Sequence, residues 1–536
     1  MKEFERIYRQ KTRKRLTIIS ISTFLLLVII IGVTVAAVAN KHSNSSNQRT
    51  PPISTSNSIK ALCAAAQYPD SCYSSISSAK GSNTTENPKE FFKLSLQVAI
   101  EALKNFSTSS SPVLQMEDES LQAAVRDCKE LFDDAIDRLH DSLALLQPAT
   151  GEKFLAASEI SDLRTWLSAA ITDQQTCMDG FEGAARDVVE KMEAAMASAT
   201  QLTSNSLAIA TKILARLENL DGFAHRRLLA STPTWLSSLP RRAFLQESSR
   251  LEPNVTVAKD GSERFRTIKE ALDLVPKKNG YPFVIYVKEG VYEEIVSVGK
   301  DKWNVTMIGD AAVGRGFMAR DMGFKNTAGP ESHQAVALRD TSDRSIFYRC
   351  SFDAYQDTLY VHSLRQFYRE CDIIGTVDFI FGDAAAVLQN CSIRPRQPMP
   401  DQKNTITAQG RTDPNENTGI VIQQCTISPH DNVTVPTYLG RPWKDYSTTV
   451  IMQSEIGGVV DPLGWLPWTD DTVPPDTIYY AEYQNSGPGS NVTGRVKWSG
   501  YRPTISRNEA AKYRVDNFIQ AGDWLPLKAI EFESGV

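Results

Sequence analysis

The most constraining feature of the sequence is a short motif that recurs about every 20 residues in the C-terminal half, with one longer interval. Each copy is an apolar run that leads into a cysteine, and the copies occupy residues 346–352, 367–373, 387–393 and 420–427. Their cysteines are separated by 21, 20 and 34 residues and are Cys350, Cys371, Cys391 and Cys425. Strands this short, repeated with this period, predict a right-handed parallel β-helix rather than a sandwich.

Equivalent cysteines in such a fold lie on neighbouring coils. Adjacent parallel strands are about 4.8 Å apart, and this separation of Cα atoms permits a disulfide. We therefore expect a disulfide between Cys350 and Cys371. Cys391 and Cys425 are expected to be either bridged or merely stacked.

Two aspartates occupy the same position in successive coils. Asp357 follows Cys350 by seven residues, and Asp378 follows Cys371 by seven residues. Equal offsets predict that the two carboxylates lie one above the other, about 5 Å apart. Carboxylates this close cannot both ionise freely, so one pKa should rise and the other should stay low. Such a pair suits an acid and a nucleophile, although either aspartate alone would be taken for a solvated loop residue.

Other side chains near the motif have complementary chemistry. Gln334 and Gln356 are neutral donors that can stabilise an oxyanion without neutralising a carboxylate nucleophile. Arg441 can pair with one aspartate in fork geometry and hold it ionised. Trp443 can lie flat against a sugar ring or, alternatively, belong to the core.

The residues alone leave two enzyme classes open. No G-x-S-x-G motif occurs in the sequence, which argues against a serine esterase. Two carboxyl groups about 5 Å apart also describe a retaining glycosidase. An esterase with an aspartate nucleophile and a glycosidase on a β-helix are therefore both compatible with the pattern.

The net charge of the chain and the spacing of its cysteines and histidines exclude two classes of partner, nucleic acids and structural metal ions. The chain has 58 Lys and Arg against 63 Asp and Glu, a formal net charge of −5, so we expect no nucleic-acid partner. The eight cysteines form no CxxC pair, and the six histidines do not fall at metal-site spacing. A structural metal centre is therefore not expected.

The N-terminal half has the composition and the apolar periodicity of α-helices. Residues 58–220 are rich in alanine and poor in glycine, and apolar residues recur there at three- and four-residue steps, as in Leu121, Val125, Cys128, Phe132, Ile136 and Leu139. This periodicity predicts an all-α bundle of four or five helices. Cys63 and Cys72 are close enough for a local disulfide, and Cys128 and Cys177 can tie two long helices together. The stripes carry no catalytic pattern, so the bundle is interpreted as a packing domain.

The first 40 residues combine a basic segment with a long apolar run. Residues 1–15 carry seven cations, and residues 16–39 are 24 residues without a charge. As a helix the run would span about 36 Å, more than the roughly 30 Å of a bilayer core. We expect a cytoplasmic tail and signal anchor at residues 1–40, with the remainder lumenal. A cleaved signal peptide is the alternative, and both readings send the chain into the secretory pathway.

Further features agree with secretion. Residues 41–57 are rich in Ser, Asn, Thr and Pro, which predicts a solvated stalk. The even number of cysteines predicts disulfides in an oxidising compartment. Eight N-x-[ST] sequons are typical of a glycoprotein and lie at Asn44, Asn83, Asn105, Asn254, Asn304, Asn390, Asn432 and Asn491.

A basic linker separates the helical region from the repeat region. Residues 221–250 contain two prolines and two dibasic steps, Arg226-Arg227 and Arg241-Arg242. Exposed, turn-rich segments of this kind are preferred sites of proteolysis, so a processing protease is an expected partner. A simple flexible hinge explains the composition equally well. The β-helix is expected to occupy residues 251–536.

Five motifs in this last region, taken in order, resemble the signature of plant pectin methylesterases. They occupy residues 290–294, 334–338, 356–359, 378–382 and 439–443. Residues 58–220 resemble the pectin methylesterase inhibitor domain, including its two-disulfide cysteine pattern. The chain is thus similar to a pectinesterase proenzyme whose inhibitor-like region is removed at a dibasic site during secretion to the cell wall.

The resemblance implies a substrate and a role for each site residue. Methyl-esterified homogalacturonan would be hydrolysed to methanol and pectate, without a metal or other cofactor. Asp378 would attack the ester carbonyl, and Asp357 would protonate methanol and then take a proton from water. Gln334 and Gln356 would stabilise the oxyanion, and Arg441 would orient Asp378. The residues expected to contact sugar rings are Trp443, Tyr355 and Phe379.

One departure from the family pattern concerns a single coil. Only 10 residues separate Ile308 from Met318, where a coil needs about 20. The family usually has about 25 further residues here, including a strand with a substrate-contacting threonine. We therefore expect both aspartates in register but weakened substrate binding and folding. A second hypothesis follows, in which a catalytically impaired chain acts through its inhibitor-like bundle as a chaperone or inhibitor.

Overall fold

The structure is a computed structural model that describes residues 55–79, 82, 87–108, 119–147, 155–214, 253–308, 316–525 and 530–536. The predicted signal anchor at residues 16–39 and the dibasic linker at 221–250 lie outside the described residues. Within the described ranges, no helix is both long and apolar enough to cross a membrane.

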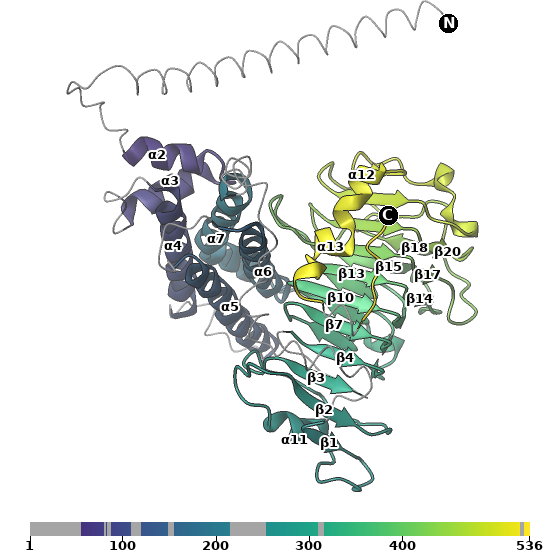
Figure 1. Ribbon diagram of the computed structural model, residues 1–536. Helices are drawn as coiled ribbons and strands as arrows, with labels where there is room; N and C mark the ends of the chain where they lie inside the picture. The colour runs from purple at the N-terminus through teal and green to yellow at the C-terminus, as the bar shows by residue number, and fades with distance from the viewer. Residues whose placement is uncertain are drawn as a thin grey trace, which may run out of the picture. The chain divides into compact units, whose positions relative to one another are not determined.

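The glycine-poor N-terminal region forms helices, as its periodicity predicts (Figure 1). They are α2 (Thr55–Cys63), α3 (Pro69–Ser78), α4 (Pro88–Thr108), α5 (Glu119–Leu145), α6 (Ala157–Asp179) and α7 (Arg186–Ile209), the last extended by a π-helical turn, Ala210–Leu214. On α5 the predicted stripe is largely buried, because Cys128, Phe132, Ile136 and Leu139 lie in the bundle core. The predicted all-α bundle is confirmed.

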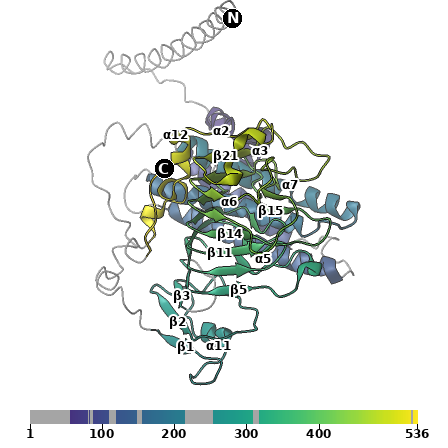
Figure 2. The same ribbon diagram turned by 90° about the vertical axis from the view of Figure 1, so that its right-hand side faces the viewer.

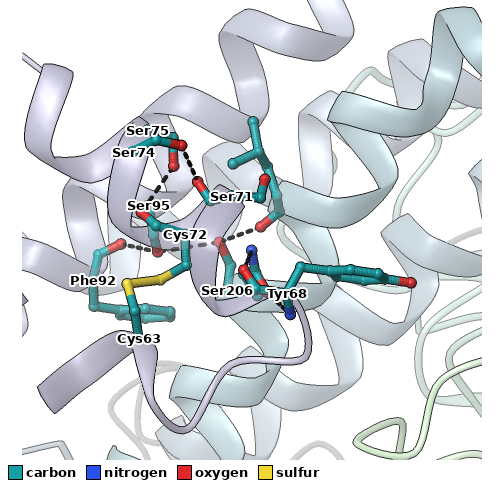
Figure 3. Close-up of a disulfide and its surroundings, with 11 residues drawn as sticks. Cys63, Tyr68, Ser71, Cys72, Ser74, Ser75, Phe92, Ser95 and Ser206 are labelled. Atoms are coloured by element: carbon teal, nitrogen blue, oxygen red, sulfur yellow. Dashed lines mark hydrogen bonds between the residues drawn. A yellow bond between two sulfur atoms is a disulfide. The ribbon is translucent and has the colours of Figure 1, made fainter. Parts of the chain in front are cut away.

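Both disulfides predicted for the bundle are present. Cys63–Cys72 joins α2 to α3, and Cys128–Cys177 joins α5 to α6. Figure 3 shows the first of them beside a buried hydroxyl pair, in which Ser206 donates to Ser95 at 3.1 Å. Each disulfide thus links two consecutive helices of the bundle.

The repeat region forms three parallel sheets, and the central coils supply a strand to each of them in turn. The first sheet has 11 strands: β1 (Val255–Val257), β2 (Phe283–Val287), β3 (Val305–Ile308), β4 (Met318–Arg320), β7 (Ser345–Tyr348), β10 (Arg365–Arg369), β13 (Ala385–Gln389), β16 (Gly419–Gln423), β19 (Thr448–Met452), β21 (Tyr479–Tyr483) and β22 (Tyr501–Arg502). The second sheet has six: β5 (Gly323–Lys325), β8 (Ser351–Asp353), β11 (Asp372–Gly375), β14 (Ser392–Pro395), β17 (Thr426–Ile427) and β20 (Glu455–Ile456). The third has five: β6 (Leu338–Asp340), β9 (Leu359–Val361), β12 (Ile380–Gly382), β15 (Asn404–Gln409) and β18 (Thr437–Gly440).

The strand register follows the sequence repeat. Phe367 pairs with Ile346 on one side and with Val387 on the other, and Val387 pairs with Val421. Figure 1 shows the first sheet as a stack from β1 upward, and Figure 2 shows β5, β11 and β14 of the second sheet in the same way. Short helices α11 (Ile268–Asp273), α12 (Arg507–Ala510) and α13 (Val515–Phe518) flank this stack. The predicted parallel β-helix is confirmed.

The repeat cysteines correct one prediction. All four are buried and free, so the expected Cys350–Cys371 disulfide is absent. The Cys350 sulfur lies 3.6 Å from the carbonyl oxygen of Tyr348, and the Cys371 sulfur lies 3.4 Å from that of Phe347. The distance between neighbouring coils brings the two Cα atoms close enough for a disulfide, but it does not fix the direction of the side chains. Equivalent side chains on stacked coils project side by side into the core, whereas a disulfide needs Cβ atoms that converge.

The shortened coil is visible in the sheet order. The first sheet continues through β4 to β3, β2 and β1, but the second begins at β5 and the third begins at β6. Residues 290–299 alternate in burial like a strand yet form none, and Ile295 is 96% exposed. The strands β1, β2 and β3 therefore have no counterparts in the other two sheets among the described residues.

Candidate active site

The candidate site is built where strands of the third sheet begin. Leu359 of β9 pairs with Ile380 of β12, so Asp357 and Asp378, each two residues earlier, occupy equivalent positions on adjacent coils. Both aspartates have left-handed backbones, with φ of 63° and 50°. This conformation is strained for most residues but tolerated by aspartate. The equal offsets of the sequence thus correspond to a real juxtaposition.

Asp378 is held by two side chains from later coils. Arg441 Nε lies 2.9 Å from Oδ1, and Arg441 Nη2 lies 2.6 Å from Oδ2, which is the predicted fork geometry. The Thr405 hydroxyl donates to Oδ1 at 2.6 Å and accepts from the Asp378 backbone N–H at 2.8 Å. Both carboxylate oxygens therefore receive charge-assisted hydrogen bonds, as an ionised carboxylate requires.

Arg441 is itself held in place by Trp468. Its Nη1 donates to the Trp468 carbonyl at 3.0 Å, and its guanidinium carbon lies 4.2 Å from the centre of the Trp468 ring. The preceding Gly440 packs directly on β15, since a Cβ there would be 2.0 Å from Thr407 Oγ1. Glycine at this position lets the chain approach closely enough for Arg441 to reach Asp378.

Asp357 has the opposite electrostatic environment. Burial raises the pKa of Asp357, and the charge of Asp378 raises it further, against a smaller lowering by Arg441, to about 8. Asp357 is therefore a proton carrier at neutral pH beside an ionised neighbour. The raised pKa of Asp357 is the effect predicted from the sequence for one of two neighbouring carboxylates.

The two glutamines lie at the edge of this pair. Gln334 and Gln356 form a parallel bridge between adjacent coils, with Gln334 exposed and Gln356 half-buried. Tyr355 is half-buried under Arg396, whose guanidinium carbon lies 4.1 Å from its ring centre. The bridge thus places the two glutamines on adjacent coils, with Gln356 next to Asp357 in the chain, and Tyr355 packs against a cation.

Phe379 corrects a second prediction. Its side chain is fully buried in the β-helix core, so it cannot contact a sugar. Asp378 has a left-handed backbone, and the residue that follows points inward. The outward aromatic residues are instead Tyr360 and Phe381, which lie three residues after each aspartate and stack with ring centres 4.3 Å apart. Tyr360 and Phe381 also follow Cys350 and Cys371 by equal numbers of residues, so the argument that paired the two aspartates could have paired these rings as well.

Two tryptophans complete this aromatic surface. Trp443 packs near Phe381, with ring centres 6.2 Å apart, and it stacks on Trp468 at 6.3 Å. Trp443 is only partly buried, so the alternative in which it belongs wholly to the core does not hold. Sequence reasoning missed Trp468, which lies in a loop without a repeat.

Helix α6 of the bundle lies against the same sheet, and both belong to the unit Thr55–Val536. Thr176 is hydrogen-bonded to His362 at 2.8 Å, and Lys444 Nζ lies 2.6 Å from Asp179. A small pocket remains between the surfaces, and its lining residues are Thr172, Gln175, Thr176, Asp179, Tyr360, Asp383, Gly410 and Trp443. The bundle therefore occupies part of the aromatic surface.

A buried ion-pair cluster fixes the other end of α6. Asp162 Oδ1 accepts from Arg344 at 2.9 Å and from Arg365 at 2.7 Å. Arg365 is 1% exposed and also pairs with Asp343 at 2.6 Å. Such charges are stable only while all partners remain in place.

Comparisons with known proteins agree with this geometry. The Pectinesterase family model matches residues 254–313 and 310–523, and the break falls at the shortened coil. The Plant invertase/pectin methylesterase inhibitor model matches residues 57–209.

Individual relatives cover most of the chain. Pectinesterase 3 of Phaseolus vulgaris is 49% identical over 92% of this chain and 90% of its own length. Probable pectinesterase/pectinesterase inhibitor 46 of Arabidopsis thaliana is 44% identical over 98% of this chain and 96% of its own. The solved pectin methylesterase from carrot is 48% identical, with a TM-score of 0.52 over 54% of this chain and 100% of that one. The chain belongs to the pectinesterase family and carries, ahead of its pectinesterase domain, a domain of the pectin methylesterase inhibitor type.

Proposed function

We propose that the chain hydrolyses the methyl esters of homogalacturonan with Asp378 as the nucleophile, releasing methanol and pectate during cell-wall modification. The observation that carries the assignment is the fork pairing of Arg441 with Asp378 beside Asp357, whose pKa burial and the Asp378 charge raise to about 8. One carboxylate is kept ionised for attack, and its neighbour keeps a proton to donate.

The reaction then proceeds in two halves. An oxygen of Asp378 bonds to the ester carbonyl carbon, and Gln334 and Gln356 donate to the oxyanion that forms. The C–O bond to methoxide breaks as Asp357 gives it a proton, which leaves an acyl-aspartate. Water then adds to this anhydride while Asp357 takes its proton, and breakdown frees the galacturonate and regenerates Asp378. We assign the sugar-contacting surface to Trp443, Tyr360, Phe381 and Trp468.

The pH dependence of this scheme follows from Asp357. Its pKa is raised to about 8 by burial and by Asp378, so the carboxyl is protonated below that pH and a carboxylate above it. Because only the protonated form can assist methanol departure, kcat/KM is expected to fall as the pH rises through about 8. A pH–rate profile checks this. An Asp357→Asn variant should lose most of its activity, and the activity that remains should no longer decline above about pH 8. A decline at the same pH in this variant would contradict the assignment.

The reaction products distinguish the two enzyme classes that the sequence left open. We expect the full-length chain to release methanol from methylated homogalacturonan without creating new reducing ends. Methanol is measured enzymatically and reducing ends colorimetrically in the same samples, with heat-treated protein as the control. New reducing ends without methanol would identify a glycosidase instead.

A proenzyme organisation accompanies this function in our proposal. Residues 1–40 would anchor the nascent chain, residues 41–57 would form a stalk, and a protease would cut in 221–250, at Arg226-Arg227 or Arg241-Arg242. The β-helix of 251–536 would then reach the cell wall as a secreted glycoprotein. The long uncharged run at 16–39, the dibasic steps and the sequons support this organisation.

The shortened coil supports a second candidate function. An impaired enzyme could act through its bundle, by assisting folding or by inhibiting other pectinesterases. The observation behind this candidate is that the second and third sheets begin only at β5 and β6. Adding the full-length chain to an active pectinesterase distinguishes the two cases. Inhibition without methanol release from this chain alone would favour the second candidate.

A further inference from the structure

Two lysines of the β-helix pair with aspartates of the bundle, and they differ in surroundings. Lys444 Nζ lies 2.6 Å from Asp179, and both side chains are about one-fifth exposed. Lys300 Nζ lies 2.6 Å from Asp137 and 3.0 Å from Asp134, with half of its own side chain exposed. Lys300 is remote in sequence from every site residue, whereas Lys444 directly follows Trp443.

Lys444 is held rigidly on the aromatic surface. Its backbone N–H donates to the Ser447 hydroxyl at 3.1 Å, and that hydroxyl donates to the Lys444 carbonyl at 2.6 Å. The Lys444 ammonium lies 4.9 Å from the centre of a Trp443 ring. A sugar stacked on Trp443 would therefore have a fixed positive charge at its edge.

Asp179 is an unusual residue to find at the C-terminal end of a helix. It is the last residue of α6, where the helix dipole disfavours a negative charge. The carboxylate is nevertheless kept beside Lys444 and beside Gln175, which donates to it at 2.9 Å. The stabilising interaction thus comes from the β-helix surface, and Asp179 also lines the pocket next to Trp443.

We propose that Lys444 is a specificity-determining residue that binds the free carboxylate of a galacturonate unit near the reacting ester, and that Asp179 occupies this position in the uncleaved chain. The inference rests on the proposed function and adds a carboxylate subsite to it. Because each turnover creates a new carboxylate, a product unit can bind Lys444 and hold the same polymer chain for the next reaction. Lightly methylated stretches would therefore be better substrates than fully methylated ones.

Full-length variants separate this role from mere attachment of the bundle. Asp179→Asn removes the bundle carboxylate and leaves Lys444 free, so it should lower the KM for lightly methylated homogalacturonan. Lys444→Gln should raise that KM about tenfold relative to Asp179→Asn, with little change in kcat, because a charged hydrogen bond is lost. The double variant should match Lys444→Gln, and Lys444→Arg should retain the preference. Heavily methylated polymer of equal length should distinguish the variants far less.

Lys300→Gln is the matched control, since it also breaks a lysine–aspartate contact with the bundle. If Lys444 served only to hold the bundle, then Lys444→Gln, Lys300→Gln and Asp179→Asn would change methanol release alike on both polymers. That outcome would overturn the inference.

Binding of an unesterified oligogalacturonate, measured by calorimetry, provides a readout that needs no turnover. Asp179→Asn should tighten it, and Lys444→Gln should abolish the gain. Equal binding by these two variants would refute the carboxylate subsite. Absence of methanol release from every variant would instead count against the proposed function, so the two failures are distinguishable.

Discussion

Replacing Asp378 with asparagine is expected to lower the rate of methanol release by about a thousandfold or more, the usual effect of removing a nucleophile. An amide oxygen cannot form the acyl intermediate, and it also leaves Arg441 without a negative partner. The thermal melt should change little, because the asparagine oxygen in the place of Oδ1 can still accept from Arg441 Nε, now at 2.9 Å, and from the Thr405 hydroxyl, now at 2.6 Å.

Asp372 provides the matched control on the preceding strand of the same coil. It lies 3.4 Å from Arg394 in an ion pair with both side chains about one-third exposed, so Asp372→Asn should leave methanol release near that of the parent. Methanol release by Asp378→Asn at the parental rate would rule out the nucleophile. The comparison should be repeated in the coil-completed chain described next, where the parental rate is expected to be higher.

Completing the short coil is expected to produce the largest gain in activity. Inserting about 25 residues of family-like sequence between Ile308 and Phe317 should raise soluble yield and lower the KM for pectin. The added turn would supply strands next to β5 and β6, where the second and third sheets now begin. Paired strand edges resist aggregation, and a wall beside Gln334 would complete the substrate surface.

A Gly/Ser-rich insert of the same length is the control for this variant. It shows whether a gain comes from the added strands or only from a longer connection between Ile308 and Phe317. Such a segment behaves as a flexible coil and adds no strands. It should therefore leave both yield and KM close to those of the parent. If the family-like insert gave no gain in methanol release or in soluble protein, the expected defect of the short coil would be refuted.

The periodic part of the fold could be predicted from the sequence because its pairing is local. A coil brings residues about 20 positions apart into register, so the repeat aligned Ile346 with Phe367 and placed Asp357 beside Asp378. The same reasoning failed for Cys350–Cys371, because register fixes position along a strand but not whether two side chains converge. Phe379 was expected at the surface from the family resemblance, yet it is buried in the core. The left-handed backbone of Asp378 determines the direction of this side chain locally.

The contacts between the bundle and the β-helix had no signal in the sequence. Thr176 meets His362, and Asp179 meets Lys444, across separations of 186 and 265 residues. No periodicity relates a helical stripe to a particular coil, and the polar residues involved resemble ordinary surface positions. Thr405 and Trp468 were missed for a similar reason, since their roles depend on where Arg441 lies after folding.

The ion-pair cluster around Asp162 has a consequence for how the bundle would be released after processing. Asp162 bridges two arginines of the β-helix, and Arg365 is almost wholly shielded from water. Cutting one peptide bond in the linker removes a tether but none of these contacts, so the severed halves would stay together as a two-chain complex. Scission and release of the bundle are then separate events, and the second is a dissociation whose extent depends on dilution.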